Sequence, residues 1–118
     1  MKLYNKVTGQ LGEGIALQYL EKKGLELVSR NFSTRFGEID IIMKDKNETV
    51  FVEVKTKKGP FFGTPEEMFT RSKYRKVKNM AVVFLKGKEV SCRIDMVAIV
   101  LDPDNSVQRL DHYENVVL

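Results

Sequence analysis

Residues 37–57 read GEIDIIMKDKNETVFVEVKTK and constrain the fold of this chain more than any other segment. Two runs rich in Ile, Val and Phe, at 37–44 and 48–57, flank the polar tetrapeptide KDKN. This is the pattern of two sheet strands joined by a turn. Charged residues nevertheless lie inside both runs, and burying a charge without a partner is costly. The positions of these charges therefore need an explanation.

The alternation of side chains along a strand divides each run between two faces. One face of each run carries Ile39, Ile41, Met43, Val50, Val52 and Val54, and the opposite face carries Glu38, Asp40, Ile42, Phe51, Glu53 and Lys55. If the two strands pair antiparallel, Asp40 and Glu53 become neighbours on one face.

Two adjacent carboxylates repel each other, and one takes up a proton unless a cation lies between them. Such oxygens suit Mg²⁺ or Mn²⁺, which bind one or two carboxylates together with water and substrate phosphate. Lys55 follows Glu53 on the same face, about 6.6 Å along the strand. Its ammonium is placed to hold an attacking water or to stabilise a phosphorane-like transition state. The alternative is an ordinary charged, solvent-facing side of an antiparallel ribbon.

The rest of the sequence predicts one domain spanning residues 1–118, without repeats or an interdomain linker. Apolar residues at helical spacing predict a first helix from Leu3 to Lys23, with Gly24 as its C-cap. Further strands are predicted at 25–32, 92–101 and 106–113, the last at a sheet edge.

A second helix is predicted to begin at TPEE, residues 64–67. Thr64 is expected to be its N-cap, Pro65 its first residue and Glu67 the partner in a capping box. The helix is predicted to run to about Lys86. Its inward face is predicted to carry Phe69, Val77, Met80, Ala81 and Phe84.

The predicted order of elements is αβββαβ followed by a final strand. The strand–helix–strand step between the third and fourth strands requires a parallel crossover. The sequence therefore predicts an α/β fold, a mixed five-stranded sheet with helices on both faces. A charged row on a covered face needs partners, which weakens the interpretation as a solvent-facing ribbon.

The charge of the chain is unevenly distributed. Residues 55–88 contain ten Lys or Arg against two acidic residues, a net +8, which leaves −4 for the rest because the whole chain is +4. A basic block of this kind is typical of a protein that binds a polyanion such as nucleic acid. A lysine-rich, solvated helix is the alternative, and charge alone does not decide between them.

The first helix places one carboxylate, Glu13, on the apolar face that it shares with Ala16 and Leu20. A lone carboxylate there is costly unless it meets a cation or several donors. The nearby glycines lower helix stability, and close approach of the helix backbone to the sheet or to a ligand would account for them. The alternative, that Glu13 extends to the surface, stays open on spacing alone.

Three further polar residues interrupt apolar patterns. Lys73, predicted between Phe69 and Val77, either reaches the active-site end of the sheet or packs its stem and extends its amine to solvent. Asp95 is expected to have a structural role, paired with a basic residue. His112 is expected to be a structural residue at the surface, because spacing gives it no carboxylate or nucleophile partner.

Cysteine content and hydropathy limit the cellular context. The one cysteine, Cys92, excludes an intramolecular disulfide and suits a reducing compartment. No signal peptide is visible, and the longest apolar run, at 80–85, is too short to cross a bilayer. We therefore expect a cytoplasmic protein without a membrane association.

These motifs together resemble a known family. GEID and, after twelve intervening residues, EVK resemble the PD-(D/E)XK nuclease signature, with Ile39 in place of its proline. GQLGEGIALQYLEKKG, RNF, FGTPEE, RSKYRK, RIDMVAI and HYEN occur in the order typical of the YraN family. The resemblance covers nearly the whole chain. YraN proteins are small bacterial proteins related in fold to archaeal-type Holliday junction resolvases.

The resemblance implies a restriction-endonuclease-like αβββαβ core and a role for four charged residues. It implies metal ligation by Asp40, Glu53 and Glu13, with Lys55 as the catalytic lysine. It further implies that Lys73 supports the site from the second helix. Lys57 stands where relatives often carry arginine.

Two classes of function follow from this sequence. The first is a Mg²⁺- or Mn²⁺-dependent endonuclease acting on DNA, including branched or damaged structures, with Glu38 behind the metal ligands and Phe61 and Phe62 stacking on an unpaired base. The residues expected to hold the phosphates are Lys57, Lys58, Arg71, Lys73, Arg75 and Lys76. The second class is a nucleic-acid-binding module with little turnover. An RNA-processing nuclease and a homodimer through the edge strand 106–113 also stay open.

Overall fold

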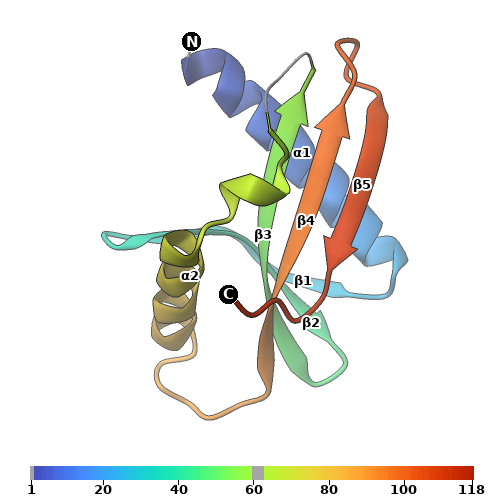
Figure 1. Ribbon diagram of the computed structural model, residues 1–118. Helices are drawn as coiled ribbons and strands as arrows, with labels where there is room; N and C mark the ends of the chain where they lie inside the picture. Colours follow the sequence, from blue (N-terminus) through green and yellow to red (C-terminus); the bar gives the residue numbers. More distant parts are fainter. Residues whose placement is uncertain (1, 60–62) are drawn as a thin grey trace.

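The computed structural model describes residues 2–59 and 63–118, and it has the predicted order of elements (Figure 1). The elements are α1 (Lys2–Lys22), β1 (Glu26–Thr34), β2 (Gly37–Asp45), β3 (Glu48–Lys58), the 3₁₀ helix η1 (Glu66–Met68), α2 (Arg71–Phe84), β4 (Cys92–Leu101) and β5 (Val107–Tyr113). Within the described residues, neither α-helix is long and apolar enough to cross a membrane.

The strands form one mixed five-stranded sheet in the order β1-β2-β3-β4-β5. Strands β3 and β4 pair in parallel, while the other neighbours pair antiparallel. The predicted parallel crossover through α2 is therefore confirmed. Strand β5 lies at the edge, as predicted, and a homodimer through that edge stays a prediction.

The two helices cover opposite faces of the sheet (Figure 1). On the α1 side, Ala16 and Leu20 pack against a buried aliphatic layer from the three central strands that includes Val52 and Ile99. On the α2 side, the helix packs against Ile42, Phe51, Ile94, Met96 and Ala98. Each central strand therefore buries apolar surface on both faces, and this burial stabilises the fold by about 25 cal/mol per Å².

Strand β2 departs from strict alternation near Asp40. Ile41 and Met43 face α1 as predicted, but Ile39 packs with Ile42 on the α2 side. The prediction for Ile39 was wrong because it assumed one flat strand. Pairing with β3 reaches only from Asp45 to Ile41, and beyond that point the β1–β2 hairpin turns past α2 (Figure 1).

The second helix begins six residues later than predicted, at Arg71 rather than Pro65, with Thr70 instead of Thr64 as its N-cap. The hydroxyl Oγ1 of Thr64 does accept a hydrogen bond from the Glu67 backbone N–H at 3.3 Å, but the turn closes only the three-residue η1. Phe69 then adopts a non-helical backbone, so the prediction that it lies on the helix was also wrong. The chain restarts with Thr70 as N-cap.

The start of α2 is stabilised by a cap and an apolar contact. Thr70 Oγ1 accepts from the Lys73 backbone N–H at 3.3 Å, and the ring of Phe69 lies 6.0 Å from that of Tyr74. This is a hydrophobic staple across the N-cap. The inward stripe is Tyr74, Val77, Met80 and Ala81, and Lys73 is exposed instead of lying within it.

Helix α1 approaches the sheet closely at Gly12. A Cβ added there would lie 1.8 Å from Oγ1 and 2.9 Å from Cβ of Thr56, so no larger residue fits without a shift of the backbone. The same addition at Gly9 or Gly14 meets nothing within 4 Å. The predicted close approach is therefore real, and one glycine provides it. Val7, which fits the apolar spacing, is 57% exposed.

Candidate metal-binding active site

Asp40 and Glu53 adjoin where β2 separates from β3. The register pairs Ile41 with Val52, which brings the preceding Asp40 beside Glu53. Asp40 Oδ2 accepts a hydrogen bond from the Val54 backbone N–H at 2.9 Å. Glu53 is only 8% exposed, so at this position the interpretation as a solvent-facing ribbon is wrong.

Asp40 holds a proton at neutral pH when no cation lies between the two carboxyl groups. Burial, which is the largest cause, a hydrogen bond to Glu53 and the repulsion of its charge raise the pKa of Asp40 from 3.8 to about 8. The Val54 N–H and the charge of Lys55 act in the opposite direction. This is the state expected for two buried carboxylates without a cation between them.

Lys55 lies against the same pair. Its Nζ is 3.7 Å from Glu53 Oε1, and the two side chains are 20% and 10% exposed. Lys73 reaches this position from α2: repulsion by Lys55, followed by partial burial, lowers the pKa of Lys73. Lys73 itself is exposed, so a role for its amine at the site stays a prediction.

Glu13 is linked to this region through an asparagine. Asn31 Nδ2 donates to Glu13 Oε1 at 3.0 Å and to Glu38 Oε1 at 2.9 Å. Burial raises the pKa of Glu13, the Asn31 hydrogen bond lowers it, and repulsion by Asp40 and Glu38 raises it again. Glu13 is half-buried and has a donor, so it does not simply extend into solvent.

Asn31 was not identified from the sequence. It opposes Asp40 in the hairpin, between the pairs Arg30–Ile41 and Phe32–Ile39, and its φ is +52°. Asparagine is one of the few residues other than glycine that adopt this left-handed conformation readily. A single Asn within a strand pattern only weakly indicates such a conformation, and its spacing in the sequence does not reveal which residues it contacts.

The donor set fits a hard divalent cation bound by two carboxylates. Asp40 and Glu53 supply the oxygens, and Mg²⁺ completes its shell with water and substrate phosphate. Among residues 2–59 and 63–118, no three His, Cys, Asp or Glu side chains converge as ligands for one ion. Glu13 therefore lies near the pair without joining it in this arrangement.

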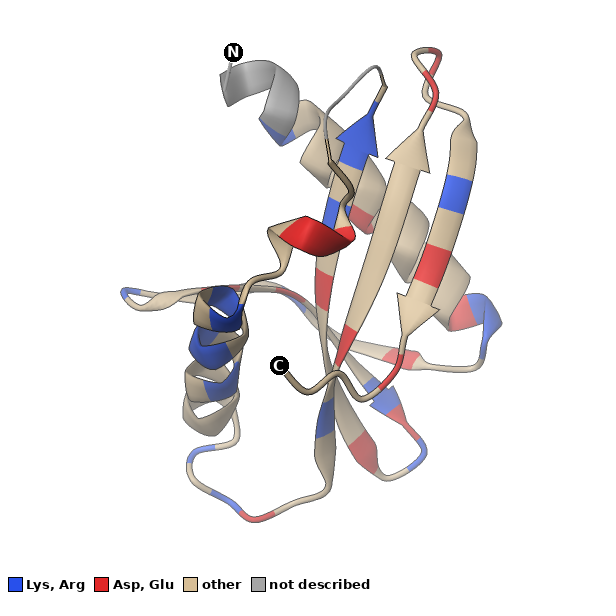
Figure 2. Ribbon diagram, viewed as in Figure 1, with Lys and Arg blue, Asp and Glu red and all other residues tan. Residues whose placement is uncertain are grey.

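The predicted phosphate-binding residues lie on two elements. Arg71, Arg75 and Lys76 are exposed on α2, and Figure 2 shows the basic residues on successive turns of this helix. Lys57 and Lys58 are half-buried at the end of β3, where alternation directs them to opposite faces. The predicted stacking residues at 61 and 62 lie outside the described residues.

Asp95 and His112 form a separate, buried network. Asp95 Oδ1 accepts from Arg93 Nε at 3.0 Å and from the Asn115 backbone N–H at 2.9 Å, which confirms the predicted structural pairing. Its Oδ2 lies 2.8 Å from His112 Nε2. The prediction of a surface histidine was wrong, since the His112 side chain is 1% exposed.

The tautomer of His112 follows from its second neighbour. Lys23 Nζ lies 2.8 Å from His112 Nδ1, and an ammonium only donates, so Nδ1 accepts and Nε2–H donates to Asp95. The network therefore ties α1, β4, β5 and the C-terminal segment together. Its partners come from distant parts of the chain, which is why local spacing did not reveal them.

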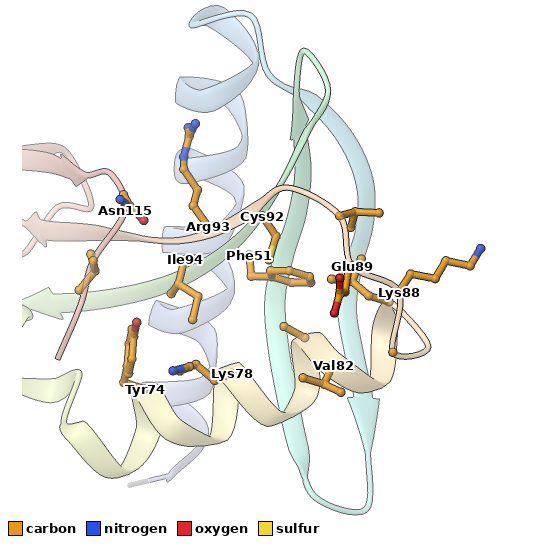
Figure 3. A pocket seen from close by; sticks show the side chains of 15 residues that line it. Phe51, Tyr74, Lys78, Val82, Lys88, Glu89, Cys92, Arg93, Ile94 and Asn115 are labelled. Carbon is orange, nitrogen blue, oxygen red and sulfur yellow. The ribbon is translucent and has the colours of Figure 1, made fainter.

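A hollow of about 410 Å³ lies on the α2 side, between the helix and the start of β4 (Figure 3). Tyr74 and Lys78 come from α2, with Lys78 Nζ 5.8 Å from the centre of the Tyr74 ring, and Ile94 and Phe51 lie across from them on the sheet. Asp40, Glu53 and Lys55 do not line this hollow. This hollow and the carboxylate pair are thus different places in the molecule.

Comparison with known proteins identifies the family. The model of the family described as "Uncharacterised protein family UPF0102" matches residues 12–99. A UPF0102 protein of Pelotomaculum thermopropionicum is 41% identical over 113 residues, 93% of this chain and 94% of that protein. A UPF0102 protein of Caldanaerobacter subterraneus subsp. tengcongensis is 39% identical over 120 residues, 98% of both chains. This chain therefore belongs to the UPF0102 family.

Proposed function

We propose that this protein is a cytoplasmic endonuclease of the PD-(D/E)XK superfamily that hydrolyses phosphodiester bonds in DNA and depends on Mg²⁺ or Mn²⁺. One observation carries the proposal: the half-buried Asp40 and the buried Glu53 lie side by side, with the Lys55 ammonium 3.7 Å from Glu53. Burial of such a set is costly for stability alone. The αβββαβ core and the resemblance to the YraN proteins support the same assignment.

In the proposed mechanism Asp40 and Glu53 would hold the metal ion. A bound divalent ion supplies Lewis acidity at the phosphate and lowers the pKa of a bound water. To serve as a ligand, Asp40 would have to release its proton, because carboxylates ligate in the ionised form. The Val54 N–H and Lys55 favour that ionised form, so they prepare the pair for a cation.

Lys55 stabilises the reaction at the phosphate. During hydrolysis a bond forms between the water oxygen and phosphorus, one phosphorus–oxygen ester bond breaks, and the leaving oxygen takes up a proton. Negative charge on the phosphate oxygens increases during this step, and the Lys55 ammonium near Glu53 stabilises that charge. Lys73, beside Lys55, adds a second cation, while Arg71, Arg75 and Lys76 hold the neighbouring phosphates.

A cleavage panel tests the proposal. Duplex, single-stranded, flapped and four-way-junction DNA, together with RNA, are incubated with the protein in Mg²⁺ or Mn²⁺. We expect cleavage of at least one DNA, and its loss in Asp40→Asn and Lys55→Ala. Glu26→Gln is the matched control, since it removes an exposed carboxylate from β1. If no substrate is cut, or if the two site variants cut as fast as the parent, the nuclease assignment fails.

The second function, a nucleic-acid-binding module with little turnover, is favoured by one observation. Glu13 is held by Asn31, and the described residues contain no three-residue metal group. In that case the panel shows salt-sensitive binding without cleavage. Cleavage of RNA but not DNA instead identifies an RNA-processing nuclease.

A further inference from the structure

The tip of the β1–β2 hairpin presents an aromatic side chain to solvent. Phe36 is 62% exposed, more than any other aromatic residue that the structure describes. Its backbone N–H donates to Thr34 Oγ1 at 3.1 Å, and Gly37 follows with a φ of +149°. Thr34 Oγ1 in turn lies 3.1 Å from Met80 Sδ on α2. The turn is thus anchored to the helix, although exposing a phenyl ring forgoes its burial energy.

A hollow of about 450 Å³ separates this ring from α2. Phe36 forms one wall, and Met80 and Val83 supply apolar surface on the helix. Lys76 and Asn79 complete the lining with an ammonium and an amide. An aromatic wall with an amide and a cation is the set of groups that binds an unpaired base, by stacking on its plane and hydrogen bonding to its edge.

Charge around the hollow matches a nucleic-acid strand. The guanidinium of Arg35 lies 4.9 Å from the centre of the Phe36 ring, on the same turn. On α2, Lys76 follows Lys73 by three residues, about 4.5 Å along the helix, and Lys73 adjoins Lys55. A row of cations therefore leads from the carboxylate pair to the hollow.

The distance from the hollow to the carboxylate pair is set by β2. Asp40 follows Phe36 by four positions, and because a strand rises about 3.3 Å per residue, their Cα atoms lie at most about 13 Å apart along the chain. Four nucleotides of a stacked B-form strand span a similar length, at 3.4 Å each. One strand can therefore reach both places at once.

We propose that the hollow between Phe36 and α2 binds an unpaired base, so that the protein recognises DNA in which a duplex adjoins unpaired nucleotides and acts within about four nucleotides of that junction. The proposal rests on the proposed nuclease function and names its substrate class. An apolar segment of a partner protein suits the hollow less well, because cations border it and acidic residues do not line it.

Binding measured without cleavage tests this inference. Fluorescence anisotropy is recorded in EDTA with a fully paired duplex and with the same duplex carrying a short single-stranded flap. We expect the parent to bind the flapped DNA about tenfold more tightly than the duplex, and Phe36→Ala to lose most of that difference while keeping its duplex affinity. Phe36→Trp should retain the preference. Val28→Ala is the control, an exposed apolar residue at the far end of the same hairpin.

A fluorescent base locates the contact. With 2-aminopurine placed at successive flap positions, the parent should quench one position by stacking, and Phe36→Ala should not. If the parent binds both DNAs equally, or if Phe36→Ala keeps the preference and the quenching, the inference is overturned, whatever the cleavage panel shows. If the preference depends on Phe36 but no substrate is cut, the base site stands and the nuclease assignment alone fails.

Discussion

Replacing Asp40 by asparagine should stabilise the metal-free protein. The carboxyl group of Asp40 is buried against Glu53, and its pKa rises from the ordinary 3.8 to about 8. Asparagine has nearly the same shape, carries no charge, and its amide oxygen can still accept from the Val54 N–H, which now donates at 2.9 Å. The variant therefore removes the cost of the paired carboxylates while keeping the local geometry.

The size of the effect follows from the pKa. Between pH 3.8 and about 8 the folded protein holds a proton on Asp40 that the unfolded chain has released. At pH 7 this is about three pKa units, or ~4 kcal/mol at 1.36 kcal/mol per unit. Relaxation around the pair and entry of water reduce this value, so we expect asparagine to raise the free energy of unfolding by about 2 kcal/mol.

The sign of the pH dependence is fixed by the raised pKa. In the parent protein, the contribution of Asp40 to the free energy of unfolding is fully present below pH 3.8. It declines as pH rises and is lost once pH passes about 8. The advantage of Asp40→Asn should thus be greatest at pH 8 and should fall to about a third of its pH 7 value at pH 5, where the difference is roughly one unit.

Thermal unfolding followed by circular dichroism in EDTA, from pH 5 to pH 9, measures this effect. For a chain of this size 2 kcal/mol corresponds to a Tm increase of about 8 °C. Glu26→Gln should leave Tm unchanged across the range, because its carboxylate is exposed. Adding Mg²⁺ should raise the Tm of the parent and not that of Asp40→Asn. An equal or lower Tm for Asp40→Asn at pH 7–8, or an advantage independent of pH, would refute the reasoning.

Three further changes test other parts of the structure. Gly12→Ala should destabilise the protein by about 1–3 kcal/mol in urea unfolding, because the new Cβ meets β3, whereas Gly14→Ala, where the space is open, should stabilise it by about 0.5–1 kcal/mol; the reverse order would contradict the packing of α1. Asp95→Asn should cost about 3 kcal/mol in the same assay, since its side chain is fully buried among ionic partners, while Glu48→Gln, one-third exposed on the same arginine, should cost about 1 kcal/mol or less. Asn31→Gly keeps the left-handed backbone but removes the bridging amide, and we expect Mg²⁺-dependent cleavage to fall about 10- to 100-fold; unchanged kinetics would show that the bridge has no role.

The charged residues of the candidate site lower the stability of the fold. A sheet covered by helices on both faces normally contains apolar residues in its central strands. Here Glu53 and Asp40 occupy positions in the centre, where similar apolar side chains would be more stable. That cost is consistent with selection for chemistry rather than for stability.

Local signals predicted most of the fold. Period-two patterns located β2, β3 and β4 to within one residue, and the order of elements required the parallel crossover that the sheet contains. The capping signal at Thr64 and Glu67 misled the prediction for α2. The predicted hydrogen bond forms there, but the helix begins where Thr70 caps it and Phe69 staples it to Tyr74. Local propensity could not decide between two competing starts.

The sequence by itself determined the strand faces on which Glu53 and Lys55 lie, because alternation is a property of the extended chain. Only the tertiary structure decided which distant groups meet them. Lys73 reaches Lys55 because α2 packs on that face, Asn31 reaches Glu13 because α1 crosses the other, and His112 is buried against Asp95 because β5 pairs with β4. Contacts between elements depend on how the helices and strands pack in three dimensions, and the local spacing of residues does not determine that packing.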